Sequence, residues 1–213
     1  MKCVLLHGLG QTSSDWKKMT DVLGVRIEAA CPDLFSLPRG KEMNYGNLYQ
    51  ALSQYLRTYS EPISICGLSL GGILALQYGI ENPDKISSVV LIGTQFTMPV
   101  RLLKFQNIVF HLMPESTFRK MGVEKKEAIR LAESMMDLDF QKDLYKIKCP
   151  VLVICGKKDK SNLKASLQLK EQIPNAKLAI VENAGHEVNI DNPGALGKIL
   201  NTFFESCNTY NMQ

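Results

Sequence analysis

The feature that most constrains the fold of this chain is the passage from an apolar run at 62–66 through the glycine-rich sequence GLSLGG at 67–72 into a helix ending near residue 80. A strand that turns sharply into a helix leaves no room for side chains beside the turn, so glycine is needed on both sides of Ser69. The segment therefore predicts a strand–turn–helix unit that pushes the Ser69 hydroxyl out at the helix N-terminus.

Short apolar runs alternate with helix-length amphipathic segments along the rest of the chain. We expect strands at 2–6, 25–30, 62–66, 86–92, 151–155 and 177–181, and further helices at about 15–23, 45–59 and 193–206. Strands joined by helices favour parallel pairing, and apolar runs without alternation are typical of strands covered on both faces. The pattern predicts one α/β domain over residues 1–213, a three-layer α/β/α sandwich with a mainly parallel sheet of about six strands.

Residues 94–145 interrupt this alternation. They have helical character, with Pro99 and Pro114 as breaks, and fall between two predicted strands. We expect a short helical insertion that serves as a lid or cap. Its apolar side chains either line a substrate pocket or form the packing face of the cap helices; they are Met98, Leu102, Leu103, Phe105, Phe110, Met113 and Phe118.

The composition argues against several classes of protein. The formal net charge is only +4, and no run of Lys or Arg exceeds two residues, so no nucleic-acid footprint is expected. No window approaches the roughly 20 apolar residues of a membrane span, and the apolar stretch near the N-terminus is too short for a signal peptide. None of the six cysteines is spaced as C-x-x-C. We expect a cytoplasmic protein with free thiols and no zinc site.

A serine hydroxyl needs a general base to act as a nucleophile, and the chain has three histidines. His186 follows the last predicted strand and is the predicted base for Ser69. His7 ends the first strand, in His-Gly-Leu-Gly, and is expected to shape that loop rather than to transfer protons. His111 lies in the insertion, where a structural or solvent-exposed role is expected.

The base in turn needs a carboxylate that fixes its tautomer. Asp159 comes just after the fifth predicted strand, at the same end of a parallel sheet as Ser69 and His186, and is the predicted partner. The alternatives are Asp33, Asp137, Asp139 and Asp191. Of these, Asp33 also follows a strand, but it precedes Ser69 and is expected to tie down its own loop.

Acyl transfer also needs N–H groups to hold the negative charge that develops on the carbonyl oxygen. The backbone N–H of Leu70, directly after Ser69, is one predicted donor. The other is the backbone N–H of Leu9, which lies between two glycines after the first strand. These two amides form the predicted oxyanion hole.

Together these parts resemble the α/β-hydrolase superfamily, because the His-Gly-Leu-Gly loop, Ser69, Asp159 and His186 follow one another in the order of that family. Residues 185–193, in which a short loop leads into a helix that starts at proline, are similar to the family's catalytic-histidine segment. The resemblance covers almost the whole chain. It implies the α/β-hydrolase fold and a serine nucleophile rather than the aspartate of haloalkane dehalogenases and epoxide hydrolases. The resemblance implies no metal and no organic cofactor.

The chain departs from this family's pattern in three places. It starts at what resembles the family's third strand, which implies a six-stranded sheet without the first two strands. The loop at 31–35 resembles the family's Pro-Asp segment but is not followed by the glycine–histidine–glycine of several branches. The insertion at 94–145 is also short for a cap.

The function predicted from these residues is hydrolysis of carboxylic esters with small to medium apolar acyl groups, through an acyl-enzyme on Ser69. Alternatives are a thioesterase, a C–C hydrolase or lyase on the same scaffold, and a non-catalytic ligand-binding member. We expect a small-molecule acyl substrate and a monomer or homodimer. The predicted substrate pocket is lined by Trp16, Phe96, Met98, Phe105 and Val188.

Overall fold

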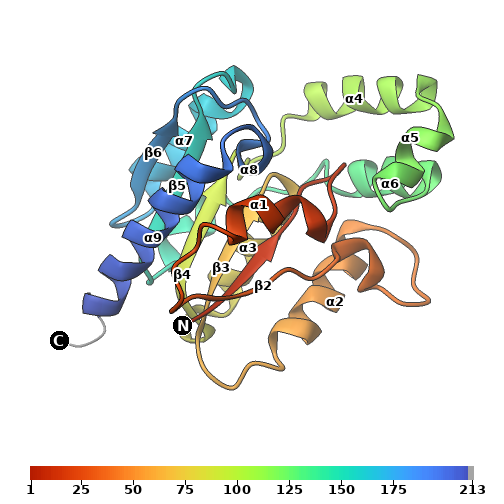
Figure 1. Cartoon of the computed structure of the whole chain (residues 1–213). Helices are drawn as coiled ribbons and strands as arrows, with labels where there is room; N and C mark the ends of the chain where they lie inside the picture. Colours follow the sequence, from red (N-terminus) through yellow and green to blue (C-terminus); the bar gives the residue numbers. More distant parts are fainter. Residues whose placement is uncertain (211–213) are drawn as a thin grey trace.

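The computed structural model describes residues 1–210, apart from the side chains of residues 101, 102, 105 and 208–210. Its described residues form one sheet of six parallel strands in the order β2-β1-β3-β4-β5-β6 (Figure 1). The strands are β1 (Lys2–Leu6), β2 (Glu28–Ala30), β3 (Ile63–Leu68), β4 (Ile86–Ile92), β5 (Val151–Gly156) and β6 (Lys177–Val181). The prediction of a six-stranded parallel sheet is confirmed.

Helices connect these strands in chain order. They are α1 (Lys17–Thr20), α2 (Tyr45–Leu56), α3 (Leu70–Glu81), α4 (Val100–Leu112), α5 (Glu115–Lys120), α6 (Lys125–Ser134), α7 (Lys160–Gln172), α8 (Val188–Asp191) and α9 (Pro193–Tyr210). Short 3-10 turns lie at Ser13–Trp16, Leu34–Ser36, Pro83–Lys85 and Gln141–Lys146. No helix among the described residues is both long and apolar enough to cross a lipid bilayer.

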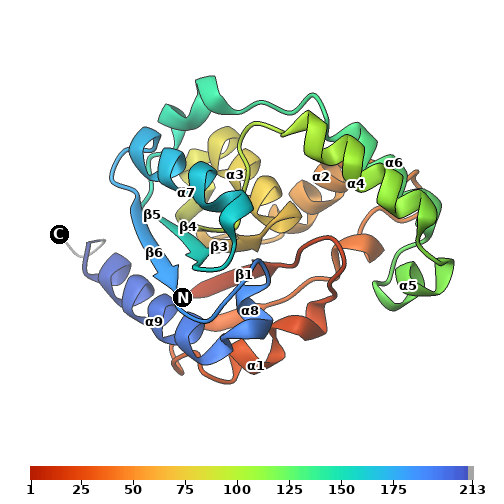
Figure 2. The ribbon, with the colours of Figure 1, turned by 90° about the horizontal axis from the view of Figure 1, so that it is seen from above.

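Both faces of the sheet are covered, as the apolar strands predict. In β1, Cys3 and Leu5 point into one core and Val4 and Leu6 into the other, because side chains alternate along a strand. Helices α1, α8 and α9 cover the first face, and α2, α3 and α7 cover the second (Figure 2). All six residues of β3 are buried, so the strand that leads to Ser69 is held from both sides.

The region between β1 and β2 differs from the prediction in two places. The expected helix at 15–23 is a 3-10 turn at Ser13–Trp16 followed by the four residues of α1. The expected strand at 25–30 is reduced to β2, because the Ile27 N–H bonds to the Gly24 carbonyl in a turn and Val25 is fully exposed. β2 is an edge strand that pairs only with β1 within the described sheet, so no second neighbour holds its ends in the sheet.

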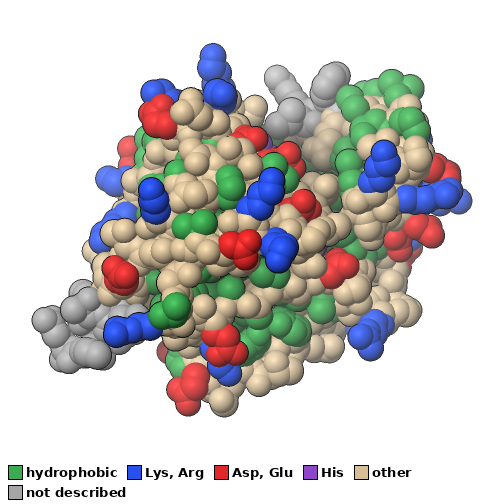
Figure 3. All heavy atoms as spheres, viewed as in Figure 1, with side chains coloured by type: hydrophobic (Ala, Val, Ile, Leu, Met, Phe, Trp, Pro, Cys, Tyr) green, Lys and Arg blue, Asp and Glu red, His purple; other side chains and the backbone are tan. Residues whose placement is uncertain are grey.

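The insertion at 94–145 contains α4, α5, α6 and the 3-10 turn that precedes β5. Helix α4 packs against α6, and a small core of Phe118, Val123 and Ala128 joins α5 to α6. The outer surface of α4 is partly apolar: hydrophobic side chains gather there in Figure 3, and Ile108 and Leu112 are exposed. The helical character of the insertion therefore agrees with the sequence analysis, while the role of the insertion as a lid stays a prediction.

Candidate active site

Ser69 lies in the turn between β3 and α3. Its backbone has φ 53° and ψ −114°, a conformation that L residues rarely adopt, and its N–H donates to the Ile92 carbonyl at 2.9 Å. The Ser69 side chain makes no capping hydrogen bond to α3. The Ser69 hydroxyl is therefore not used to cap α3.

The glycines around this turn are required by close backbone approach. A Cβ on Gly67 would lie 2.1 Å from the Gly71 carbonyl oxygen, and a Cβ on Gly71 would lie 2.3 Å from the Leu6 carbonyl oxygen. The backbones of β1, β3 and α3 thus meet without room for a methyl group. This packing holds Ser69 in its unusual conformation.

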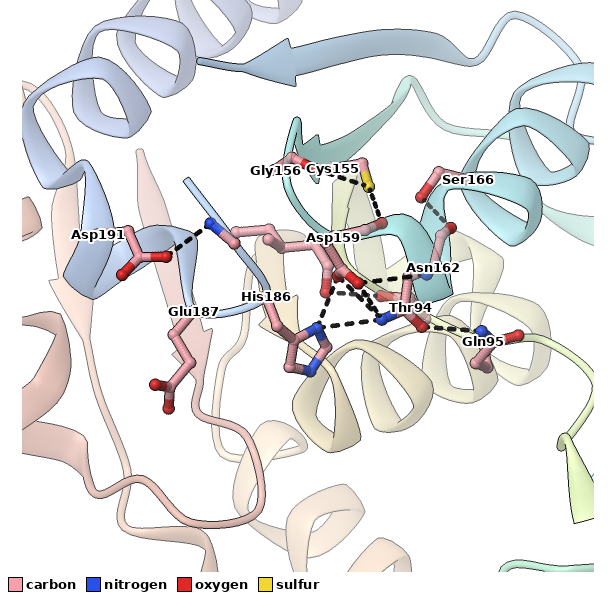
Figure 4. Close-up of polar contacts among 12 residues, drawn as sticks. Thr94, Gln95, Cys155, Gly156, Asp159, Asn162, Ser166, His186, Glu187 and Asp191 are labelled. Carbon is pink, nitrogen blue, oxygen red and sulfur yellow. Dashed lines mark hydrogen bonds and ion pairs between the residues drawn. The ribbon is translucent and has the colours of Figure 1, made fainter. Parts of the chain in front are cut away.

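Asp159 and His186 meet at the carboxyl ends of β5 and β6. The Nδ1 atom of His186 lies 2.8 Å from Oδ2 of Asp159, whose side chain is only 5% exposed, while that of His186 is 39% exposed (Figure 4). Burial alone would raise the pKa of the Asp159 carboxyl, but hydrogen bonds from His186 and Asn162 outweigh it and lower that pKa. An ionised Asp159 places the imidazole proton on Nδ1 and leaves Nε2 able to accept one.

Ser69 and His186 line one cavity of about 160 Å³ together with Leu9 and Leu70. Leu70 is the first residue of α3, where backbone N–H groups have no partner within the helix. The structure therefore brings Ser69, His186, Leu9 and Leu70 to one cavity, and Asp159 reaches it through His186. The rest of the wall is mainly apolar and comes from α3 and the insertion: Ile73, Met98, Pro99, Leu103, Ala132 and Met135.

Asn162 was not among the residues predicted from the sequence, although it contacts both members of the pair. Its Nδ2 lies 2.9 Å from each carboxylate oxygen of Asp159 and 3.1 Å from Nδ1 of His186. Its Oδ1 accepts a 2.8 Å hydrogen bond from Nε2 of Gln95. The available signal was an Asn three residues after Asp159, because Asp159 caps α7 and Asn162 lies in the first turn of that helix.

Gly93, directly after β4, is a second residue of the site that was not predicted from the sequence. It has φ +53°, and a Cβ there would lie 2.9 Å from Nδ1 of His186 and 3.2 Å from Oδ2 of Asp159. Only glycine leaves this space open while it adopts the left-handed conformation at low cost. A glycine that ends an apolar strand was the signal in the sequence.

His7 is fully buried beneath the loop that carries Leu9. Its Nδ1 is 3.0 Å from the Gly8 carbonyl, and its Nε2 accepts the Leu34 N–H at 3.0 Å. Burial lowers the pKa of His7 despite the nearby Asp33 carboxylate, so the ring is held neutral. This geometry fits the expected structural role in the loop.

The remaining acidic and basic candidates lie outside the cavity lining. His111 is exposed on α4, with Nδ1 2.7 Å from the Asn107 carbonyl. Asp33 accepts a hydrogen bond from the Phe35 N–H, and Asp137 follows α6. Asp139 accepts hydrogen bonds from the Thr97 hydroxyl and the Gln141 N–H. Asp191 accepts the Gly185 N–H at 2.6 Å. The last of these bonds anchors the loop that holds His186 (Figure 4).

A buried amide pair joins the loop after β1 to α8, the short helix that follows His186. Gln11 and Asn189 exchange hydrogen bonds of 3.2 Å through their carboxamides, and both side chains are almost fully buried. Gln11 also donates to Glu187, and Asn189 donates to the Asp15 carbonyl. This pair fixes the predicted oxyanion loop relative to the segment that carries His186.

The predicted pocket residues are only partly brought together. Met98 lines the cavity, and Phe105 lies outside the described side chains. Trp16 and Val188 do not line it, because both are buried in the core beneath α1, α8 and α9. Phe96 is 5% exposed and packs into the opposite core, while its neighbour Gln95 faces the cavity.

Known proteins resemble the chain in sequence and in fold. The model of the alpha/beta hydrolase family matches residues 3–198. A putative 2-succinyl-6-hydroxy-2,4-cyclohexadiene-1-carboxylate synthase of Bacillus subtilis is 24% identical over 95% of this chain and 90% of its own length. A pimeloyl-[acyl-carrier protein] methyl ester esterase of Aromatoleum aromaticum is 25% identical over 89% of this chain and 92% of its own length.

Solved structures show the same fold. A carboxylesterase structure from Nitrososphaera gargenis superposes with a TM-score of 0.84 at 17% identity, over 98% of this chain and 91% of that one. MenH from S. aureus superposes with a TM-score of 0.81 at 16% identity, over 98% and 94%. With the family match over most of its length and the six-stranded parallel sheet, the chain belongs to the alpha/beta hydrolase family.

Proposed function

We propose that this protein is a serine hydrolase that cleaves carboxylic esters of small to medium acyl groups through an acyl-enzyme on Ser69. The observation that carries the proposal is the cavity that Ser69 and His186 share. At this cavity, Nδ1 of His186 is hydrogen-bonded to Oδ2 of the buried Asp159 at 2.8 Å. A nucleophile, a base and a carboxylate that orients the base are the parts that acyl transfer needs.

In the proposed mechanism, Nε2 of His186 takes the Ser69 proton as Oγ attacks the ester carbonyl. The backbone N–H groups of Leu9 and Leu70 hold the oxyanion, and His186 then protonates the leaving alcohol. Water, activated by the same His186, hydrolyses the acyl-enzyme. Asp159 keeps the Nδ1 proton in place throughout and stabilises the imidazolium.

The cavity supports a small acyl group. A cavity of about 150 Å³ accommodates a molecule the size of benzene, and this one measures about 160 Å³. Met98, Pro99 and Leu103 place the insertion over it, which supports the proposed lid role of residues 94–145. An acyl chain of about six heavy atoms would fill the space.

The similarity to a protein named as a carboxylate synthase gives a second candidate, a lyase on the same scaffold. The name of that relative describes an anionic compound. The described lining residues of this cavity include no Lys or Arg side chain. The lack of a cation among these described residues favours ester hydrolysis over chemistry on a multiply anionic substrate.

The test is a panel of p-nitrophenyl esters of increasing acyl chain length, measured beside acyl-CoA thioesters with wild type and Ser69→Ala. We expect kcat/KM for the esters to peak at short to medium chains and to fall by about 10³-fold or more in Ser69→Ala. Full activity of Ser69→Ala would refute the proposal. If the thioesters turn over faster than the esters, the protein is a thioesterase rather than a carboxylic-ester hydrolase.

A further inference from the structure

The acyl cavity combines an apolar wall with three neutral carboxamides. Its apolar side chains come from α3 and the insertion, whereas Gln95, Gln106 and Asn162 also line it. Apolar pockets use a small number of such polar groups to orient a ligand. Two of these three carboxamides have hydrogen-bonding capacity that the described protein atoms do not use.

Gln95 presents its carbonyl oxygen away from the Asp159–His186 pair. Its Nε2 is committed to Oδ1 of Asn162 at 2.8 Å, and Asn162 in turn uses its Nδ2 on Asp159. In Figure 4, Oε1 of Gln95 points away from Asn162, and it has no hydrogen-bond partner among the described side chains. The bond to Asn162 thus fixes the orientation of a carboxamide that lines the cavity and leaves its Oε1 available as an acceptor.

Gln106 lies on α4 three residues after Leu103, so the two side chains share the helix face that meets the cavity. The Gln106 side chain is half-buried. Its carboxamide makes no hydrogen bond within the part of the chain that the structure describes, so both a donor and an acceptor are available there.

The same wall is poorly suited to an anionic acyl group. Apart from His186, the described lining residues carry no ionisable side chain. A carboxylate moved from water against these described residues loses its hydration and gains no cation from them. A purely hydrocarbon acyl group, in contrast, would cover Oε1 of Gln95 and the Gln106 carboxamide without offering either a hydrogen-bond partner.

From these observations, and resting on the proposed ester hydrolysis, we infer that the cavity selects a neutral acyl group that carries a hydrogen-bonding substituent, such as an amide, and that Gln95 and Gln106 recognise this substituent. We expect the relevant esters to have about six heavy acyl atoms, a size that matches the cavity volume of about 160 Å³.

The experiment compares p-nitrophenyl esters of N-acetylglycine, 4-methylpentanoic acid and succinic acid, whose acyl groups share one size and shape but are neutral and polar, hydrocarbon, and anionic. The quantity measured is the ratio of kcat/KM for the amide ester to that for the hydrocarbon ester. We expect Gln106→Met to lower this ratio about fivefold relative to wild type, the value of one neutral hydrogen bond. Intrinsic ester reactivity cancels in this comparison.

Two further variants sharpen the test. Lys104→Met changes an exposed residue on the same helix that does not line the cavity, and it should leave the ratio unchanged. Gln106→Lys supplies a cation, and it should raise kcat/KM for the succinyl ester about tenfold relative to the hydrocarbon ester. This gain cannot come from a folding defect.

The inference is overturned if Gln106→Met leaves the ratio unchanged, if Gln106→Lys gives no gain, or if wild type prefers the succinyl ester. These results differ from a failure of the proposed function. In that case wild type would hydrolyse none of the three esters faster than Ser69→Ala does.

Discussion

Replacing Gly93 with alanine should slow catalysis while leaving the fold intact. The new Cβ would lie 2.9 Å from Nδ1 of His186, about 0.5 Å short of the 3.4 Å at which ordinary contact begins. Since a misplacement of about 1 Å can cost about 100-fold in rate, displacing His186 by half that distance should lower kcat about tenfold or more.

The same substitution also strains the backbone, and the two effects can be separated. An alanine at φ +53° costs about 1–2 kcal/mol, which lowers Tm by about 2–8 °C in a chain of this size. Gly40 provides the control, because it has φ +69° and a Cβ there meets nothing within 4 Å. Gly40→Ala should therefore lower Tm to a similar extent.

The assay is steady-state hydrolysis of a short p-nitrophenyl ester, with thermal unfolding of both variants measured in parallel. We expect Gly93→Ala to lose kcat and Gly40→Ala to keep it. If Gly93→Ala retains wild-type kcat, or if both variants lose kcat equally, the contact with His186 does not control activity.

Three other substitutions test the groups around the site. Gln11→Leu breaks the amide pair that joins the loop after β1 to α8, and it should lower kcat about tenfold with little change in KM. The control is Asn201→Leu, which removes an amide bridge to Val22 and Gly24 away from the site and should lower Tm but not kcat. Asn162→Leu removes the two side-chain hydrogen bonds to Asp159 and should lower kcat about tenfold, and a wild-type kcat would show that the Asn162 side chain is not needed to orient that carboxylate. Because burial lowers the pKa of His7 below 6.5, the unfolded chain binds a proton that the folded chain does not, and stability should fall as the pH decreases below that value. His7→Gln should lack this component in urea titrations at about pH 7.5 and about pH 5.5, and an identical pH dependence in both proteins would contradict the assignment.

Local signals were sufficient to predict the sheet and the position of Ser69. The β3–α3 turn is dictated by glycines that are close to Ser69 in sequence, and the four inner strands β1, β3, β4 and β5 are apolar because they are buried on both faces. β2 was predicted too long, because the end of an edge strand depends on tertiary contacts rather than on the β propensity of Val25 and its neighbours.

The pocket could not be predicted in the same way. Trp16 and Val188 follow the right strands, but which side of the sheet each one faces is decided by how α1, α8 and α9 pack. Asn162 and Gln95 come from segments more than sixty residues apart and meet only in the folded chain. A single sequence carries no signal for such a contact.

The most direct test of Ser69 as the nucleophile is labelling with a fluorophosphonate, followed by mass spectrometry of the peptides. We expect one adduct, on the peptide that contains Ser69, absent in Ser69→Ala and formed about 10³-fold more slowly in His186→Gln. Equal labelling of wild type and Ser69→Ala, or an adduct on another residue, would contradict it.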